Sequence, residues 1–117
     1  MSRAAISTLE QIAYARSGDK GRNANIGVIA HNEAGYAWLQ AHLTAQRVKE
    51  YFAHTPVDRV ERFELPNLHA LNFLLYGVLG KGGSQTLAID TQGKALGQVL
   101  LQMQVDITSE EIESFRA

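Results

Sequence analysis

The stretch Arg16-Ser17-Gly18-Asp19-Lys20-Gly21-Arg22-Asn23-Ala24-Asn25 lies between two apolar runs of the 117-residue chain and decides how its first half is organised. Two glycines within it permit positive φ angles and close approach of other groups to the backbone. The aspartate and asparagines around them favour turns, because such side chains hydrogen-bond their own backbone. We therefore expect a polar loop here, called the 16–25 segment below.

Short apolar runs on both sides of this segment predict strands. The first covers about residues 8–15, with Leu9, Ile12 and Tyr14, although its alternation is imperfect. The second covers residues 26–30, Ile-Gly-Val-Ile-Ala, a β-branched run bounded by polar residues. The two strands could form a long-looped hairpin or be neighbours in one sheet.

The period becomes helical from Asn32, a good N-cap residue. The apolar positions of this helix follow at i, i+3 and i+7: Tyr36, Leu39 and Leu43. Thr44 can cap a second helix, which Pro56 ends. Residues 57–65 are the third strand candidate, and their many charges indicate a solvated face or an edge position.

Residues 68–79 are apolar nearly all round, and we expect a helix there with Asn67 as its cap. Such a helix must be covered on more than one side, so a second subunit is an expected partner. Residues 80–84 break it, and residues 86–89 predict a fourth strand. A helix to about residue 101 and a short strand to 107 follow. Thr108 and Glu111 have capping-box spacing for a terminal helix.

This order of elements predicts an α+β fold. We expect a ferredoxin-like arrangement, a mixed or antiparallel sheet of about four strands with helices packed on one face. An extra C-terminal element is added to it. The chain is expected to form a single domain with its core at about residues 8–107 and a tail at 108–117.

Composition excludes several functional classes. A formal net charge of −1 without a basic face disfavours nucleic acid and anionic membranes as partners. The absence of cysteine excludes disulfides and thiolate chemistry. The four histidines lack metal-ligand spacing, so neither a metal nor a cofactor is expected. The N-terminus lacks a signal-peptide core, and no apolar run reaches the ~20 residues of a membrane span, so a cytoplasmic location is expected.

Polar residues in three places form the candidate ligand site. The 16–25 segment could use backbone N–H groups to bind an anion, or its polar side chains could only shape a turn. Asn72 lies in an apolar run, where an unpaired amide costs about 1–3 kcal/mol, so it should have a partner. That partner could be the 16–25 segment or a ligand. The candidate residues are Arg16, Ser17, Asp19, Lys20, Asn23, Asn25, Asn67, Asn72, Gly82, Gly83 and Lys94.

Three ordered blocks resemble the small ferredoxin-fold domain of acyclic terpene utilisation protein A-like proteins. They are Arg16 to Gly21 with Asn25-Ile26-Gly27, then Leu65 to Leu68 with Ala70 to Phe73, and then Asp90 with Gln92-Gly93-Lys94. In that family the small domain often follows a larger domain associated with acyclic terpene and acyl-CoA breakdown. The resemblance implies a ferredoxin-like fold and a role beside a separately encoded large subunit. It brings no established catalytic residues.

Two functional hypotheses follow. The first is an accessory or ligand-binding subunit, homo-oligomeric, that offers the 16–25 segment to an anionic small molecule or a partner chain. The second is an enzyme or half-site acting on an acyl-CoA-type or other anionic substrate. In it, Arg16 and Lys20 hold the anion and Asp19 acts as the base.

Overall fold

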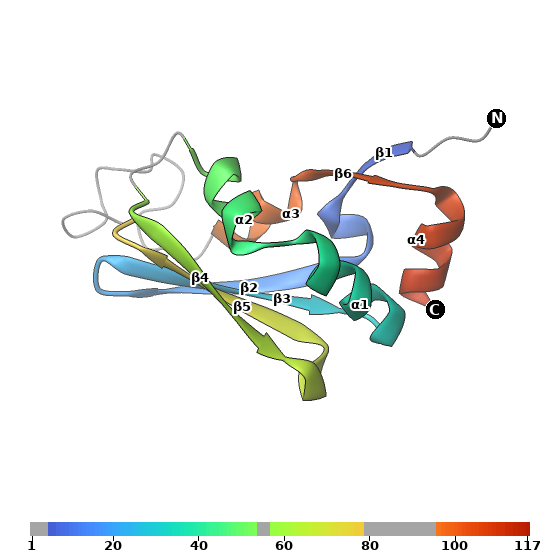
Figure 1. Cartoon of the computed structure of the whole chain (residues 1–117), viewed down its shortest axis with the longest axis horizontal. Coiled ribbons are helices and arrows are strands. Elements are labelled where there is room, and N and C mark those ends of the chain that lie inside the picture. The colour runs from blue at the N-terminus through green and yellow to red at the C-terminus, as the bar shows by residue number, and fades with distance from the viewer. Residues whose placement is uncertain (1–4, 54–56, 79–95) are drawn as a thin grey trace.

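The computed structural model describes residues 5–53, 57–78 and 96–117, and it shows a four-stranded antiparallel sheet with helices on one face (Figure 1). The strand order is β2-β3-β5-β4. The strands of this sheet are β2 (Ala13–Lys20), β3 (Asn23–Ala30), β4 (Arg59–Leu65) and β5 (Ala70–Tyr76). A separate antiparallel pair joins β1 (Ala5–Thr8) to β6 (Gln104–Ile107). The predicted ferredoxin-like α+β class is thereby confirmed.

The 16–25 segment is a β-hairpin rather than a loop. Residues 13–20 pair with residues 23–30 throughout, and only Gly21 and Arg22 form the turn. Gly21 has a φ of 67°, as the first central position of a type II′ turn requires. The predicted loop and the ends of both flanking strands were therefore wrong. The backbone N–H groups expected to cradle an anion are on strands whose residues pair in the sheet.

The predicted helix at 68–79 was also wrong. Pro66–Leu68 form a short 3-10 turn (η2), and residues 70–76 form β5, a central strand paired with β3 on one side and β4 on the other. Asn67 therefore caps no helix. Hydrogen-bonded pairing on both edges outweighs the helical propensity of leucine, and the apolar run is nearly continuous because half-buried side chains alternate with the buried Leu71, Phe73 and Leu75. A short apolar run does not distinguish these two cases.

The remaining described helices follow the sequence signals closely. They are α1 (Glu33–His42), α2 (Ala45–Tyr51), α3 (Leu96–Leu101) and α4 (Ser109–Arg116), with a 3-10 turn η1 (Leu9–Gln11) before β2. The Asn32 and Thr44 side chains accept hydrogen bonds from Gly35 N and Arg47 N, and Thr108 with Glu111 forms the capping box. The predicted helix to 101 and strand to 107 are confirmed. The predicted break at 80–84 and strand at 86–89 lie outside the described residues.

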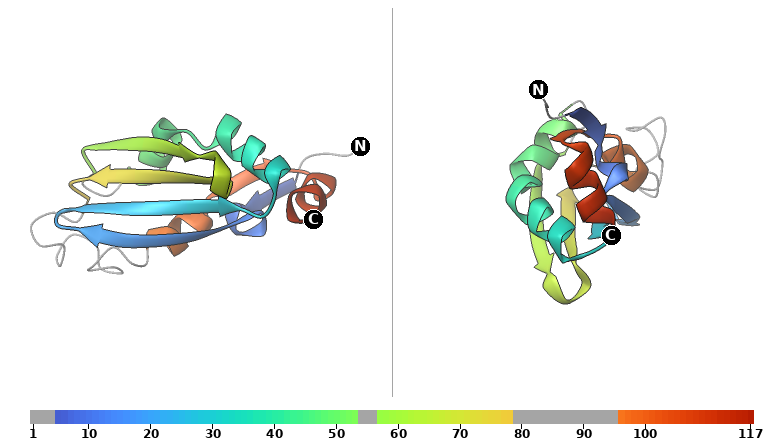
Figure 2. Two further views of the ribbon diagram at one scale, coloured as in Figure 1. Left: turned by 90° about the horizontal axis from the view of Figure 1, so that it is seen from below. Right: turned by 90° about the vertical axis from the view of Figure 1, so that its right-hand side faces the viewer.

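The core lies between the sheet and the helices. Ala24, Ile26, Val28 and Ala30 of β3 are buried on this side, and Leu71, Phe73 and Leu75 of β5 are buried beside them. Helix α3 packs on β2, α1 on β3 and α2 on β4. The Arg62 guanidinium donates to the carbonyl oxygens of Gln40 and Leu43, both at 3.0 Å, and so satisfies the end of α1. Seen from below, no described helix lies in front of the four strands (Figure 2).

An open sheet face as the candidate ligand site

The side of the sheet away from the helices, called the open face below, carries the exposed apolar side chains. Because side chains alternate along a strand, Tyr14 and Arg16 of β2 lie on this face with Asn25 and Gly27 of β3. The large apolar residues that are exposed within the described chain are all on this face or at its end: Tyr14 (49%), Phe63 (45%), Leu65 (40%) and Leu68 (64%). Such a concentration on one face is typical of binding surfaces.

A hollow of about 430 Å³ lies on the open face near η2. Its lining residues are Tyr14, Arg16, Asn25, Gly27, Ile29, Leu65, Leu68 and Ala70. The absence of a side chain at Gly27 makes the surface concave here. A Cβ at this position would project between its neighbours at ordinary contact distances, 3.8 Å from Asn72 Oδ1 and 3.9 Å from Arg16 O. The hollow therefore exists because position 27 has no side chain, and it requires no strained backbone conformation.

One side of the hollow is polar and the other is apolar. Arg16 and Asn25 supply the polar side, and Asn25 Nδ2 donates to Asn72 Oδ1 at 3.5 Å, a long hydrogen bond. Within the described residues, the Arg16 side chain makes no hydrogen bond or ion pair, so its guanidinium is free for an anion. The expected partner of Asn72 is therefore found in the 16–25 segment. An amphiphilic molecule fits such a surface, with its charge at Arg16 and its apolar body near Leu65 and Leu68.

The other candidate residues do not meet at this hollow. Ser17 faces the helices, where its Oγ accepts a hydrogen bond from Gly97 N at 3.0 Å. Asp19 is two residues after Ser17 in β2, so it lies on the same, helix-facing side of the strand. Asn23 Oδ1 accepts from Gly77 N at 2.8 Å, which anchors the end of β5.

Five further candidates have a different outcome. Lys20 pairs with Asn23 beside the hairpin turn, and Asn67 is exposed in η2, next to a lining residue of the hollow. Gly82, Gly83 and Lys94 lie outside the described residues. The structure thus brings together Arg16, Asn25 and Asn72 among the sequence candidates.

A cluster of charged and aromatic groups lies at the other end of the open face. The Tyr76 hydroxyl donates to Glu61 Oε1 at 2.6 Å, and the Arg59 guanidinium carbon lies 3.9 Å from the centre of the Tyr76 ring. The hydrogen bond to Glu61 raises the pKa of Tyr76 above its usual value, with burial and the Glu61 charge adding to the effect. This cluster holds β4 against β5 at the end away from the hollow.

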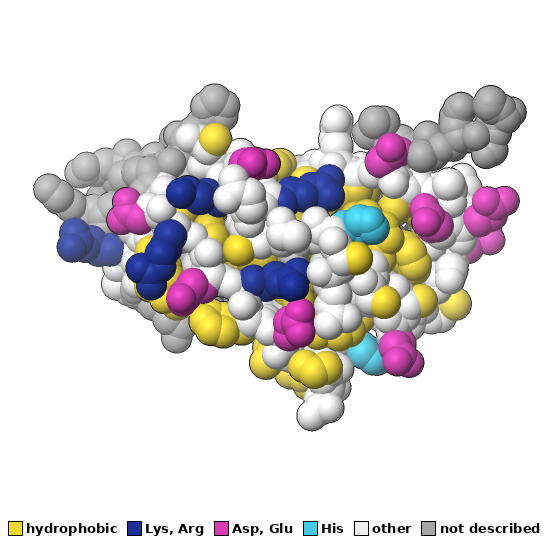
Figure 3. All heavy atoms as spheres, in the orientation of Figure 1, with side chains coloured by type: hydrophobic (Ala, Val, Ile, Leu, Met, Phe, Trp, Pro, Cys, Tyr) yellow, Lys and Arg dark blue, Asp and Glu magenta, His cyan; other side chains and the backbone are white. Residues whose placement is uncertain are grey.

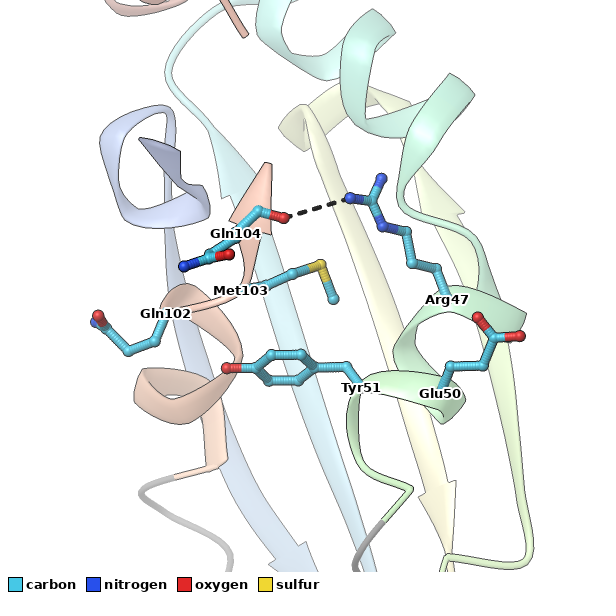
Figure 4. A pocket seen from close by; sticks show the side chains of 6 residues that line it. All are labelled: Arg47, Glu50, Tyr51, Gln102, Met103 and Gln104. Atoms are coloured by element: carbon cyan, nitrogen blue, oxygen red, sulfur yellow. Dashed lines mark hydrogen bonds between the residues drawn. The ribbon is translucent and has the colours of Figure 1, made fainter. Parts of the chain in front are cut away.

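A second groove, of about 550 Å³, lies between α2 and the segment joining α3 to β6 (Figure 4). Its polar side chains already bond to the protein. Arg47 donates to Gln104 O at 3.4 Å, and the Tyr51 hydroxyl donates to Val99 O at 2.6 Å. Burial raises the pKa of Tyr51, which keeps this donor protonated. These contacts hold α2 against α3 and β6. The polar groups of the groove thus stabilise the fold, and the groove is a weaker candidate for a ligand site than the hollow on the open face.

The helix-bearing side has mixed charges. In the view of Figure 1, basic and acidic side chains are interspersed over it, while hydrophobic side chains gather at its lower edge near the end of the β4–β5 hairpin (Figure 3). No group of three or more histidine, aspartate or glutamate side chains suited to a metal occurs among the residues placed by the structure. None of the helices in residues 5–53, 57–78 and 96–117 is long and apolar enough to cross a membrane.

Most of the apolar lining of the hollow escaped the sequence analysis. Tyr14 was assigned to a strand, but that strand was predicted to end at residue 15. It was therefore not apparent that Tyr14 and Arg16, two residues apart in one strand, lie on the same face. Leu68 and Ala70 were assigned to the false helix at 68–79. A glycine within the β-branched run at 26–30 was the available signal, because glycine inside a strand often marks a close approach to the backbone.

Comparison with known proteins gives one match. The model of the AtuA ferredoxin-like domain matches residues 7–106. No curated protein and no solved structure matches the chain. The matched region includes the strands β2 to β5 and the turn η2, which together line the hollow. The chain belongs to the AtuA ferredoxin-like domain family.

Proposed function

We propose that this chain is a ligand-binding accessory subunit whose open face takes a small anionic molecule with an apolar body. The observation that carries the proposal is the hollow itself, with Arg16 and Asn25 on one side and Ile29, Leu65 and Leu68 on the other. Its volume of about 430 Å³ is within the ~300–1,000 Å³ of small-molecule sites. An arginine without a protein anion, beside an apolar surface, suits a carboxylate on a short hydrocarbon chain.

The placement of Asp19 supports binding rather than acid–base catalysis. Arg16 lies on the open face, whereas Asp19 lies on the side of β2 that carries Ser17 and α3. A base must reach the proton that it removes, within about 3 Å or through one water. A small molecule held at Arg16 is separated from Asp19 by the sheet. The half-site hypothesis therefore has less support than the binding hypothesis.

Family membership supports the accessory part of the proposal. The resemblance implies a role beside a separate large subunit, and ligand binding on an open face is a contribution that a small subunit can make. The chemistry of the hollow limits the molecule to one with a single anionic end. A nucleic acid does not fit, because the open face offers no continuous basic path.

Binding of hexanoate, followed by amide chemical shifts in nuclear magnetic resonance, tests the proposal. We expect hexanoate to shift the amides of Arg16, Asn25 and Gly27, and to bind more tightly than uncharged hexanol. Arg16→Gln should weaken hexanoate binding ten- to a hundredfold, since a hydrogen bond to a charged group contributes about 1.5–3 kcal/mol. Arg22→Gln is the matched control, because Arg22 is exposed in the hairpin turn and does not line the hollow.

Two results would contradict the proposal. One is equal binding of hexanoate by the Arg16→Gln and Arg22→Gln variants. The other is a set of shifts confined to the groove that Arg47 and Tyr51 line. Equal affinity for hexanoate and hexanol would reject the anionic part alone.

A further inference from the structure

The open face has the properties of a surface that another protein covers. Four large apolar side chains are exposed on it or at its end, and β5 carries Leu74 and Tyr76, both half-buried, on the same side. By contrast, the opposite side of the sheet is covered by three helices. Exposed apolar side chains gathered on one face are a common feature of surfaces that another molecule covers.

The size of the face limits what can cover it. Its strands number four, and β4 and β5 have seven residues each. At about 4.8 Å between strands and about 3.3 Å per residue, the face measures roughly 400 Å² as a flat rectangle. Side-chain relief and the projecting Leu68 raise the accessible area toward the ~600 Å² per partner of the smallest specific interfaces. The occupant must therefore cover most of the face, as another flat sheet does and a short peptide does not.

The arrangement of side chains on the face is suited to a second copy of itself. The ladder places one row across the sheet, Arg16, Gly27, Asn72 and Phe63, and the next row, Gly18, Asn25, Leu74 and Glu61. Arg16 is thus on one edge strand and Glu61 on the other, one row apart. A two-fold axis running roughly along the strands, between β3 and β5, superposes β2 of one copy on β4 of the other. Sheets packed face to face in this way keep their strands within about 30° of each other.

We propose that a second copy of this chain packs on the open face and closes the hollow. In this arrangement Phe63 of the partner subunit lies across the mouth of the hollow, against Arg16, and Glu61 of the partner subunit lies beside the same guanidinium. Both contacts occur twice, as two-fold symmetry requires. The Phe63 ring stacks on the arginine at the rim of the hollow, and Glu61, which lies 3.8 Å from Arg59 in its own chain, meets Arg16 at both edges.

The proposal is independent of ligand binding, because the oligomeric state is measured without any ligand. Light scattering coupled to size-exclusion chromatography should give the mass of a dimer at about 100 µM protein. Phe63→Lys should weaken the dimer at least tenfold, because it places a cation against Arg16 of the partner subunit. Glu50→Arg, on the exposed side of α2, is the control and should leave the dimer unchanged.

Exchange of charges makes the test specific to this pairing. Arg16→Glu and Glu61→Arg should each weaken the homodimer, because each change sets two like charges together at both edges. A mixture of the two variants should recover a heterodimer, since at each edge one acidic and one basic side chain meet again. Thermal melts establish that each variant is folded, which matters because Glu61 also accepts the Tyr76 hydroxyl.

Three results would overturn the proposal. They are a monomeric wild-type protein at about 100 µM, a dimer that Phe63→Lys leaves intact, and a mixture that shows no recovery over its components. The first result would leave a separate large subunit as the occupant of the face. Failure of hexanoate to bind would not affect any of these measurements, and a monomer that binds hexanoate would reject the dimer alone.

Discussion

At the scale of single residues, the candidate site depends on which polar side chains lack a hydrogen-bond partner within the protein. Ser17 and Asn23 have polar atoms that satisfy backbone N–H groups of Gly97 and Gly77, so their polarity serves the fold. Arg16 directly precedes Ser17 in the sequence, points to the opposite side of the strand, and has no such side-chain bond among the described residues. Strand alternation thus separates Arg16 from Ser17, whereas Asn23, on the same face as Asn25, differs from Arg16 by its bond to Gly77 N.

The pH dependence of Tyr76 is a residue-scale prediction. Its raised pKa, caused first by the hydrogen bond to Glu61, means that folding favours the protonated phenol. The resulting stability is fully present below the usual tyrosine pKa of about 10 and is lost as pH rises through the folded-state pKa. Glu61→Gln should move the Tyr76 transition back toward the usual value. Ultraviolet absorbance of tyrosinate, with Tyr76→Phe to assign the transition, measures this effect.

Tyr51 is the internal reference for that titration. Burial alone raises its pKa, so Glu61→Gln should leave the Tyr51 transition in place. A Tyr76 transition that is unchanged in the Glu61→Gln variant would show that the hydrogen bond is absent in solution.

At the scale of elements, Asn32 links the start of α1 to the end of α4. Its Oδ1 caps α1 by accepting from Gly35 N at 2.8 Å, and its Nδ2 donates to Ser114 O and Ala117 O at 2.8 and 3.0 Å. Asn32→Ala should lower the free energy of unfolding by about 1–2 kcal/mol, because the cap and the link to α4 are both lost. Asn32→Asp keeps the cap and loses the donor, so it should have the smaller effect. Urea unfolding measures both variants, and equal losses would show that the link contributes nothing.

Strand β5 gives a second element-scale prediction. Because β3 and β4 pair with it on both sides, its amides should exchange with solvent more slowly than those of the edge strands β2 and β4. Amide hydrogen exchange followed by nuclear magnetic resonance measures the order directly. Faster exchange at residues 71–75 than at residues 14–18 would contradict the central position of β5.

Sequence analysis succeeded where a local signal decides the structure. Asn32, Thr44 and the Thr108–Glu111 pair begin helices because each side chain bonds backbone within its own first turn. It failed at β5, where partners some 45 residues away along the chain decide between strand and helix, as in the pairing of Phe73 with Ile26. The hollow shares this origin: a partner for Asn72 in the 16–25 segment was one of two predicted alternatives, but Arg16, Tyr14 and Leu65 join this site only through the strand order.

At the scale of the whole molecule, the two faces of the sheet have separate roles. One face holds the helices and the core, and the other carries the hollow, the exposed aromatic side chains and the free arginine. Ligand binding and self-association are proposed for the same open face, and both use the Arg16 guanidinium, which would meet a bound carboxylate in one case and Glu61 of the partner subunit in the other. The central claim is therefore that the open face, rather than the groove between α2 and β6, is the functional surface.

Filling the hollow at its floor tests this claim most directly. Gly27→Val adds a side chain where a Cβ has only ordinary contacts, and a β-branched residue suits a strand, so the melting temperature should be unchanged or higher. Gly18→Ala is the control, on the same face but outside the lining. In a hexanoate titration followed by amide shifts, we predict normal binding by Gly18→Ala and at least tenfold weaker binding by Gly27→Val. Wild-type affinity in a folded Gly27→Val variant would contradict the account.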